Sequence, residues 1–115
     1  MAAFNQILFN GASGLNEITR STTITGSTYS VDSGSRPDYV IFCNRAGVIT
    51  ITLSAAAADG RMLMIKDISG AAATYNITIV HNASETIDGS NSYVMNVSYE
   101  SICLIADASG NWWVV

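Results

Sequence analysis

Strict alternation of apolar and hydroxyl-bearing residues is the feature that most constrains how this chain folds. It is clearest in Val48–Leu53, where Ile and Leu alternate with two threonines, and it recurs in Tyr75–Val80. Successive side chains of a β-strand point to opposite faces, so each run offers one apolar face to a core and one weakly polar face to the outside. No comparable stretch repeats apolar residues at helical spacing. The pattern predicts an all-β protein.

Turn sequences divide the chain into short strands. Asp59-Gly60 and Asp88-Gly89 are residue pairs that tolerate the positive φ angles of tight hairpin turns. Between such turns we expect seven or eight strands, drawn from Glu17–Ile24, Tyr39–Cys43, Val48–Leu53, Met62–Lys66, Tyr75–Val80, Tyr93–Val97, Ile102–Asp107 and Trp112–Val115. This number and spacing favour a single antiparallel β-sandwich or jelly-roll-like domain over residues 17–115. Residues 1–16 precede it as a short N-terminal arm or as a first strand.

A weak internal repeat runs through the second half of the sequence. Ile49-Thr50-Ile51, Asp59-Gly60 and Asp67-Ile68-Ser69-Gly70 are echoed in the same order by Ile77-Thr78-Ile79, Asp88-Gly89 and Asp107-Ala108-Ser109-Gly110. The last spacing is longer, as one inserted hairpin would make it. Because Ile-Thr-Ile and Asp-Gly are common in β proteins, we attribute the repeat to this shared composition. A solenoid is disfavoured because repeat folds need about three or more units.

The chain is poor in charge. Only 12% of its residues are charged, against about 25% in an average protein, while 49% are hydrophobic. The net charge is −4, Lys66 is the sole lysine, and the arginines stand singly along the sequence. A nucleic-acid-binding protein clusters its basic residues to neutralise phosphates, so we expect no such partner. The apolar runs fall short of the roughly 20 residues of a membrane helix, and we expect no membrane contact.

The N-terminus and the cysteines bear on the compartment. Met1–Gln6 has neither the positive charge nor the continuous apolar core of a signal peptide. We therefore expect synthesis in the cytoplasm, a reducing compartment. Cys43 and Cys103 both lie in apolar, strand-like runs, Val40–Cys43 and Ile102–Ile105. Reduced, buried thiols are favoured over the one disulfide that two cysteines allow.

The residue types that carry catalysis are scarce. His81 is the only histidine and, with two cysteines in apolar runs, gives no metal-ligand spacing. The chain has no Gly-x-Ser-x-Gly nucleophile motif and no phosphate-binding glycine loop. Asp67, Asp88 and Asp107 each stand beside a turn, where aspartate normally accepts backbone hydrogen bonds. We expect no catalytic residue, no metal site and no cofactor.

Two sets of apolar and aromatic residues are candidates for binding. The first set would contact another subunit or a larger particle, and consists of Phe4, Ile7, Leu8, Phe9, Trp112 and Trp113. Trp112 and Trp113 would point to opposite faces of one strand, so that one lies in the core and the other meets a neighbour. The second set would stack on a sugar, and consists of Tyr93, Tyr99 and Trp113. Tyr93 and Tyr99 are also in phase with Met95 and Val97, which makes a core position the competing interpretation.

Three short motifs link the second half of the chain to a known group. They are Lys66-Asp67 followed by Ser69-Gly70, then Ile87-Asp88-Gly89, and a final Asn111-Trp112. With these, Gly60–Val115 resembles a pattern common in virion proteins of tailed bacteriophages. The resemblance implies a small β domain of the kind found at tail-fibre tips and in capsid decoration (cement) proteins, usually as a trimer. It carries no catalytic residue.

Two functions follow as expectations. The first is a non-enzymatic, trimeric head decoration protein that binds the outer capsid surface of the virion and stabilises adjacent major capsid subunits. The short chain, without a fibrous stalk, favours this function over one in the tail. The alternative is a receptor-binding module at a tail-fibre or baseplate tip that recognises a host surface glycan through the second set of residues.

Overall fold

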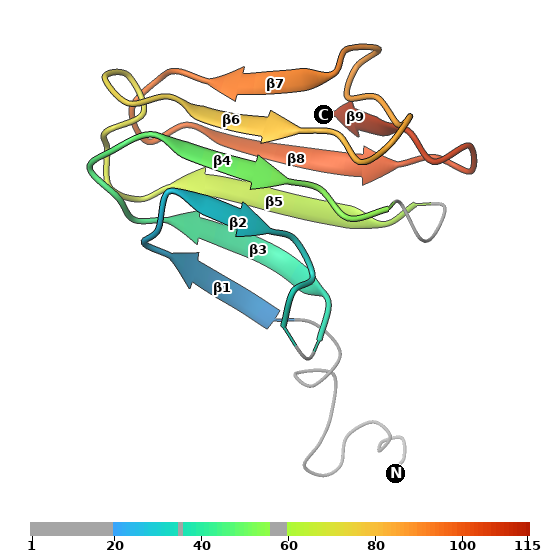
Figure 1. Ribbon diagram of the computed structural model, residues 1–115, viewed down its shortest axis with the longest axis horizontal. Coiled ribbons are helices and arrows are strands. Elements are labelled where there is room, and N and C mark those ends of the chain that lie inside the picture. The colour runs from blue at the N-terminus through green and yellow to red at the C-terminus, as the bar shows by residue number, and fades with distance from the viewer. Residues whose placement is uncertain (1–19, 35, 56–59) are drawn as a thin grey trace, which may run out of the picture.

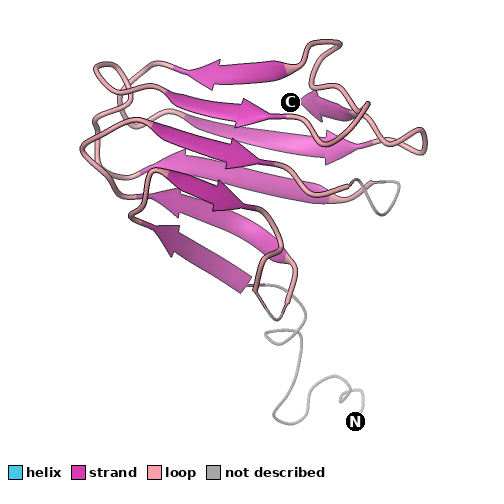
Figure 2. Cartoon of the chain, in the orientation of Figure 1, coloured by secondary structure: helices cyan, strands magenta, loops and turns pink. Residues whose placement is uncertain are grey.

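The computed structural model describes residues 20–34, 36–55 and 60–115, and within them the chain forms strands and no helix (Figures 1 and 2). The strands are β1 (Arg20–Ile24), β2 (Thr28–Ser30), β3 (Asp38–Cys43), β4 (Ile49–Thr52), β5 (Met62–Asp67), β6 (Ile77–Val80), β7 (Ser92–Met95), β8 (Ser101–Ala106) and β9 (Trp112–Val114). They make a five-stranded sheet of order β1-β3-β5-β8-β9 and a four-stranded sheet of order β2-β4-β6-β7. The predicted all-β class is confirmed.

The first six strands alternate between the two sheets, so hydrogen-bonded neighbours are two strands apart in sequence. Four pairs are parallel: β1 with β3, β3 with β5, β2 with β4, and β4 with β6. Only β5–β8, β6–β7 and β8–β9 are antiparallel. This corrects the antiparallel pairing that we expected throughout. Side-chain alternation determines which face of a strand is buried, but it carries no information about the direction of the neighbouring strand.

The alternating path makes three stacked turns of a coil, which Figure 1 shows as strand pairs rising from β1 and β2 to β5 and β6. Within this coil the repeated Ile-Thr-Ile segments lie side by side: Ile49, Thr50 and Ile51 pair with Ile77, Thr78 and Ile79. The echo that we attributed to composition is therefore structural for these strands. Three turns also meet the minimum number of units for a repeat architecture, which the sequence had disfavoured.

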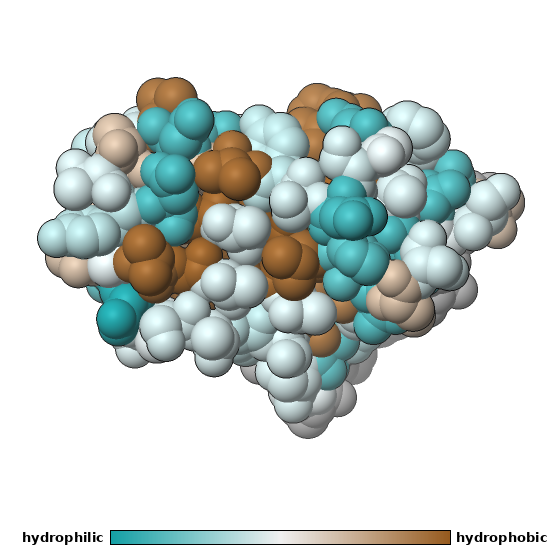
Figure 3. All heavy atoms as spheres, turned by 45° about the horizontal axis from the view of Figure 1, so that its top comes forward, coloured by the Kyte–Doolittle hydropathy of each residue, from teal (hydrophilic) through white to brown (hydrophobic). Residues whose placement is uncertain are grey.

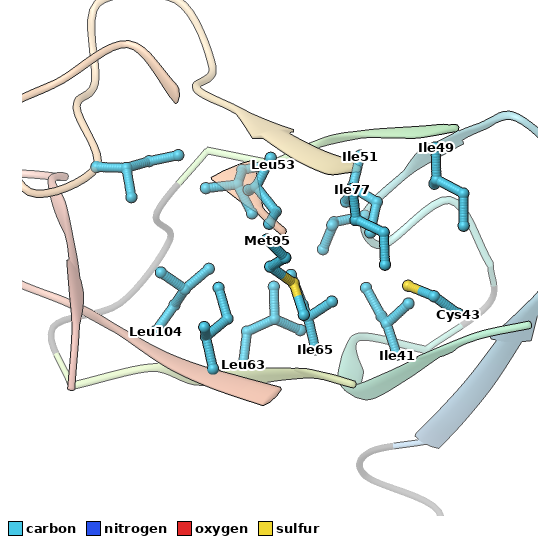
Figure 4. Packing of buried hydrophobic residues seen from close by; sticks show 14 of the residues in the cluster. Ile41, Cys43, Ile49, Ile51, Leu53, Leu63, Ile65, Ile77, Met95 and Leu104 are labelled. Carbon is cyan, nitrogen blue, oxygen red and sulfur yellow. The ribbon is translucent and has the colours of Figure 1, made fainter. Parts of the chain in front are cut away.

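The inner faces of the two sheets supply one common core. Figure 4 shows Ile41, Leu63 and Ile65 of the five-stranded sheet facing Ile51 and Ile77 of the other sheet, with Met95 between them. The labelled side chains are all fully or almost fully buried. Burying an aliphatic side chain of this size contributes about 1.5–3 kcal/mol before the entropy of ordering it is subtracted. The alternation read from the sequence is what creates these inner faces.

Some strand limits differ from those expected. The strand predicted over Tyr93–Val97 ends at Met95, because the Glu100 carboxylate accepts hydrogen bonds from the N–H groups of Asn96 (3.0 Å) and Val97 (3.1 Å) and turns the chain. The short β2 was missed because it has three residues, of which only Tyr29 is apolar. The Asp88-Gly89 turn is confirmed, with φ angles of 52° and 79°.

Candidate interaction surface

The outer face of the five-stranded sheet is unusually apolar. Its three central strands, β3, β5 and β8, point apolar side chains outward as well as inward. We call this the apolar face, and it comprises Val40, Phe42, Met62, Met64, Cys103, Ile105 and, on β9, Trp113. A contiguous exposed apolar patch is uncommon on a monomeric protein, which makes this face the candidate contact surface of the molecule.

Strand register arranges the apolar face in rows across the sheet. One row runs through Val40, Met64 and Cys103, which are paired across β3, β5 and β8. A second row runs through Met62, Ile105 and Trp113. Side chains directly opposite one another on neighbouring strands lie about 5 Å apart, so each row is a continuous strip. The patch is therefore a property of three strands that are remote in sequence.

The third row carries a charged side chain, that of Lys66. It runs through Phe42, Lys66 and Ser101. The Lys66 ammonium does not stand free, because it donates a hydrogen bond to the carbonyl oxygen of Tyr99 and lies 5.9 Å from the centre of the Tyr99 ring. The described side chains that make up the apolar face include no carboxylate, and the Lys66 ammonium is engaged; the Asp107 carboxylate borders the face, where it accepts a hydrogen bond from the Trp113 indole at 2.9 Å.

The outer face of the four-stranded sheet is different. Thr28, Thr50 and Thr78 are paired in register across β2, β4 and β6, and Ser30 lies opposite Thr52 in the next row. Threonine has a high strand propensity and keeps a hydroxyl group in water, which suits a solvated sheet face. Figure 3, with the β7 end of Figure 1 turned toward the viewer, shows hydrophobic residues on this side as separate patches between paler ones.

Asp67 organises one end of the five-stranded sheet. The side chain is fully buried at the end of β5. One carboxylate oxygen accepts hydrogen bonds from the N–H groups of Ser69 (3.0 Å) and Gly70 (3.1 Å), and the other accepts from those of Ala72 (3.1 Å) and Tyr99 (3.0 Å). Burial opposes ionisation, but these hydrogen bonds outweigh it and hold the pKa of Asp67 below its usual value. The carboxylate thus joins two loops that are distant in sequence.

Gly70 and Tyr99 show how closely these two loops approach. A Cβ atom on Gly70 would lie 2.5 Å from the Tyr99 ring, and the φ angle of Gly70 is 76°. Only glycine meets both conditions without strain. The Lys66-Asp67 and Ser69-Gly70 motif is therefore explained by local structure: its acid is a hydrogen-bond acceptor, its glycine makes room for an aromatic ring, and its lysine binds the same loop.

A second cluster of charge lies at the other end of the coil. Arg61 forms a bidentate ion pair with Asp32, at 2.6 and 2.8 Å, and donates to the carbonyl oxygen of Asp38 at 2.8 Å. The buried Asp38 carboxylate accepts hydrogen bonds from the hydroxyl groups of Thr22 and Tyr29, both at 2.7 Å. These groups bind each other across the ends of β1, β2 and β3. Their arrangement is that of a structural network.

The Arg61–Asp32 ion pair predicts how the free energy of unfolding depends on pH. Burial raises the pKa of Asp32, but hydrogen bonds from Arg61 and Ser54 outweigh this effect and lower that pKa to about 2. Because the folded-state pKa lies below the unfolded value near 3.8, the stabilisation is present above pH 4 and is lost as the pH falls toward 2. We expect the free energy of unfolding, measured by urea titration, to decline over this range. Asp32→Asn should decline less steeply, and a slope equal to that of the wild type would contradict the assignment.

The two adjacent tryptophans differ in burial. Trp112 is 0% exposed, and the Arg61 guanidinium lies 5.9 Å from the centre of its ring, whereas Trp113 is 45% exposed on the apolar face. The expected division between the faces of one strand is therefore observed. It also corrects the choice of Trp112 as a contact residue, because a fully buried ring has no surface for a partner.

The other predicted contact residues, Phe4, Ile7, Leu8 and Phe9, lie outside the described residues, as does the rest of the segment 1–16.

The three candidate sugar-binding residues are not brought together. Tyr93 is partly buried against the core and its hydroxyl group donates to Glu100 at 3.1 Å. Tyr99 is 60% exposed and lies beside Lys66 at one end of β5. Trp113 pairs with Ile105, which is opposite Met62 at the other end of β5. The structure therefore does not form an aromatic platform from this set.

The remaining sequence candidates have structural positions. Both cysteines are free: Cys43 lies in the core, where burial and then the charge of Asp67 raise its pKa to about 12, while Cys103 is half-buried on the apolar face. Asp88 and Asp107 accept backbone hydrogen bonds from the N–H groups of Val114 and Asn111, as expected of aspartates beside turns.

No group of three His, Cys, Asp or Glu side chains among the described residues is placed to hold a metal ion. Nor does that part of the chain contain a helix long and apolar enough to cross a bilayer.

Comparison of the chain with protein-family models and with curated protein sequences finds no match.

The apolar face has a signal in the sequence that differs from the alternation of apolar and hydroxyl residues. Val40–Cys43, Met62–Ile65 and Ile102–Ile105 are continuous apolar runs, without the hydroxyl residues that alternate in β4 and β6. A strand that is apolar on both faces is typical of a sheet that is covered on both faces. These runs are β3, β5 and β8, which are neighbours in the sheet.

Proposed function

We propose that this protein is a non-enzymatic structural component of a tailed-bacteriophage virion, a homotrimer that decorates the outer surface of the head. In this role residues 17–115 act as a single sandwich-like unit that binds the major capsid protein and stabilises adjacent capsid subunits. No nucleic acid, membrane or cofactor takes part.

One observation carries the proposal: on a protein of net charge −4, the described side chains that form the apolar face include no carboxylate. Low charge reduces the desolvation penalty when a surface is covered by a partner. The same property lowers the solubility of a free monomer. A chain with this surface is therefore suited to permanent assembly.

The arrangement of charged groups supports a structural role. Asp67 is occupied by backbone N–H groups, and Arg61 and Asp32 are occupied by each other. Buried carboxylates in an active site are instead directed toward a substrate. The likeness of Gly60–Val115 to phage virion proteins supports the same function independently.

The test is to locate the protein and then remove it. Electron microscopy of phage particles with a gold-labelled antibody should place the protein on the head. Particles stripped of the protein should lose their DNA at a lower temperature than untreated particles, and adding the purified protein back should restore heat resistance. Heads that are unlabelled and equally heat-resistant would refute the proposal.

The same preparation tests the alternative function. Label at the tail tip, together with saturable binding of the purified protein to host cells, would favour recognition of a host glycan. Tyr99 and Trp113 are exposed and available to such a ligand, but their separation means that each would have to act in a different sugar subsite.

A further inference from the structure

We infer that the loops at one end of the coil bind the major capsid protein, and that they receive a carboxylate set among apolar side chains of that protein. These loops follow β1, β3, β5 and β7, and comprise residues 25–27, 44–48, 68–76 and 96–100. We call them the loop end, which lies at the left of Figure 1 and is separate from the apolar face. The identity of the partner rests on the proposed function, whereas the surface and its chemistry follow from the residues of the loop end.

Exposed apolar side chains gather at the loop end. They are between 40% and 60% exposed, and comprise Val48, Ile68, Tyr75, Val97 and Tyr99. Among the described residues, the loops at the opposite end of the coil expose no aromatic or branched aliphatic side chain. Apolar side chains that cluster on one part of a surface mark a contact with another molecule.

Hydrogen bonds between the loops join these side chains into one surface. The Ser69 hydroxyl group donates to the carbonyl oxygen of Arg45 at 3.1 Å, which ties the β5–β6 loop to the β3–β4 loop. The N–H of Ile49 donates to the carbonyl oxygen of Asn76 at 3.3 Å and brings the same two loops together on the other sheet. The β7–β8 loop joins them through Tyr99, whose ring lies against the β5–β6 loop.

The charged groups of the loop end leave one positive charge without a counter-charge. The four loops contain only two charged residues, Arg45 and Glu100. Both carboxylate oxygens of Glu100 accept hydrogen bonds, one from backbone N–H groups of its own loop and the other from the Tyr93 hydroxyl group. Lys66, which borders these loops at the end of β5, donates to the carbonyl oxygen of Tyr99. Arg45 has no carboxylate partner among the described residues.

The Arg45 guanidinium is held in place but uses few of its donors. It lies against Gly47, where a Cβ atom would be 2.8 Å from Nε. Nη1 donates to the carbonyl oxygen of Thr25 at 3.4 Å, and the buried Nε makes no hydrogen bond within the described part of the chain. A guanidinium has five N–H donors in a planar fork that matches the two oxygens of a carboxylate. Nη donors therefore remain for a carboxylate on a partner.

This combination of groups fits a protein partner. Arginine and tyrosine often dominate the binding energy of protein interfaces, where surrounding apolar contacts exclude water. One isolated guanidinium does not fit a nucleic acid, which requires several basic side chains to neutralise its phosphates. Val48, Ile68 and Val97 are aliphatic and suit the apolar side chains of a protein.

The distribution of charge along the coil favours the loop end for a partner carboxylate. The described loops at the opposite end carry more acidic than basic side chains, namely Asp32, Glu85, Asp88 and Asp107 against Arg36 and Arg61. A carboxylate would be repelled there and attracted by Arg45. The difference between the two ends thus orients the molecule on its partner.

The test measures binding of the full-length protein to phage heads from which it has been stripped. Arg45→Gln removes the charge and the planar fork, and should weaken binding by about 30-fold or more, as expected for the loss of a charged partner in a desolvated contact. Arg36→Gln removes the same charge at the opposite end and should bind with nearly wild-type affinity. Circular dichroism of each variant checks that the sheets have formed.

Chemical treatment of the heads tests the carboxylate. Carbodiimide and glycinamide convert exposed carboxylates of stripped heads into neutral amides. This treatment should weaken binding of the wild type but leave the residual binding of Arg45→Gln unchanged, because both changes remove the same interaction. An equal further loss in Arg45→Gln would mean that no head carboxylate pairs with Arg45.

Footprinting locates the contact without any substitution, and so serves if Arg45→Gln does not fold. Hydroxyl radicals oxidise exposed tyrosine rings. Tyr75 and Tyr99 should be protected when the protein is bound to heads, whereas Tyr39, which is 42% exposed at the other end of β3, should keep its reactivity.

The outcomes separate the surface from the function. Heads that bind the wild type and Arg45→Gln equally, or bound protein whose Tyr75 and Tyr99 stay reactive, would overturn the loop end as the contact and leave head decoration standing. A wild type that does not bind stripped heads would refute head decoration and the capsid partner together. Binding that is lost in Arg45→Gln and kept in Arg36→Gln would support both.

Discussion

Replacing Asp67 with alanine is expected to lower the free energy of unfolding by about 3–5 kcal/mol, because it leaves buried backbone donors without an acceptor. The carboxylate accepts four backbone N–H groups, from Ser69, Gly70, Ala72 and Tyr99. Each unsatisfied buried donor costs about 1–3 kcal/mol, and such costs are not fully additive. Urea denaturation at one fixed protein concentration measures the loss, since the unfolding of any protein that self-associates depends on concentration.

Two further variants make this prediction specific. Asp67→Asn keeps one acceptor oxygen but turns an NH₂ group toward the other pair of donors, so its stability should be intermediate. Asp107→Ala removes a similar set of hydrogen bonds, from Ser109, Asn111 and the Trp113 indole, at an exposed turn. Water replaces an exposed acceptor, so this loss should be clearly smaller. Equal losses for Asp67→Ala and Asp107→Ala would contradict the central role of Asp67.

Replacing Trp112 with alanine is expected to cost about 3–5 kcal/mol, the usual range for removing a buried aromatic ring. The ring is completely buried in the core shared by both sheets and stacks with Arg61 at 5.9 Å. Its indole N–H has no hydrogen-bond partner among the described residues. Trp112→Phe keeps most of the ring volume and removes this unsatisfied donor, so it should retain most of the stability.

Trp113→Ala is the matched control, one residue along the same strand. This ring is 45% exposed on the apolar face, so its removal should leave the free energy of unfolding of the single chain almost unchanged and should instead weaken the association proposed above. Measuring unfolding and sedimentation on both variants distinguishes a core residue from a contact residue. A Trp112→Ala variant that folds with unchanged stability but fails to associate would mean that Trp112 belongs to an interface.

The sequence predicted the strands better than their arrangement. Apolar alternation located β4 and β6 and identified Ile49, Ile51, Ile77 and Ile79 as core residues, all of which are buried. It did not predict that β4 and β6 are parallel neighbours, because the order and direction of strands depend on contacts between residues that are far apart in sequence. The Ile-Thr-Ile repeat carried this information, but two copies of a common triplet do not distinguish a stacked repeat from chance.

The sequence also predicted the role of three aspartates beside turns. Asp67, Asp88 and Asp107 were predicted to accept backbone hydrogen bonds, and all three do so. The hydrogen bond from the Tyr99 N–H to the Asp67 carboxylate was not predictable, because the two residues are 32 positions apart in sequence. A hydrogen bond of this kind exists only after both loops have been brought together by the sheets.

By itself, the sequence determined that the chain would form strands, which isoleucines of β4 and β6 would face the core, and where several turns would fall, because these depend on side-chain type and near neighbours. Only the tertiary structure decided that Val40–Cys43, Met62–Ile65 and Ile102–Ile105 would lie side by side as β3, β5 and β8. Each run alone is a short apolar strand. Their second faces become one surface because pairing between distant segments aligns them, and a surface is a property of the sheet, not of any strand.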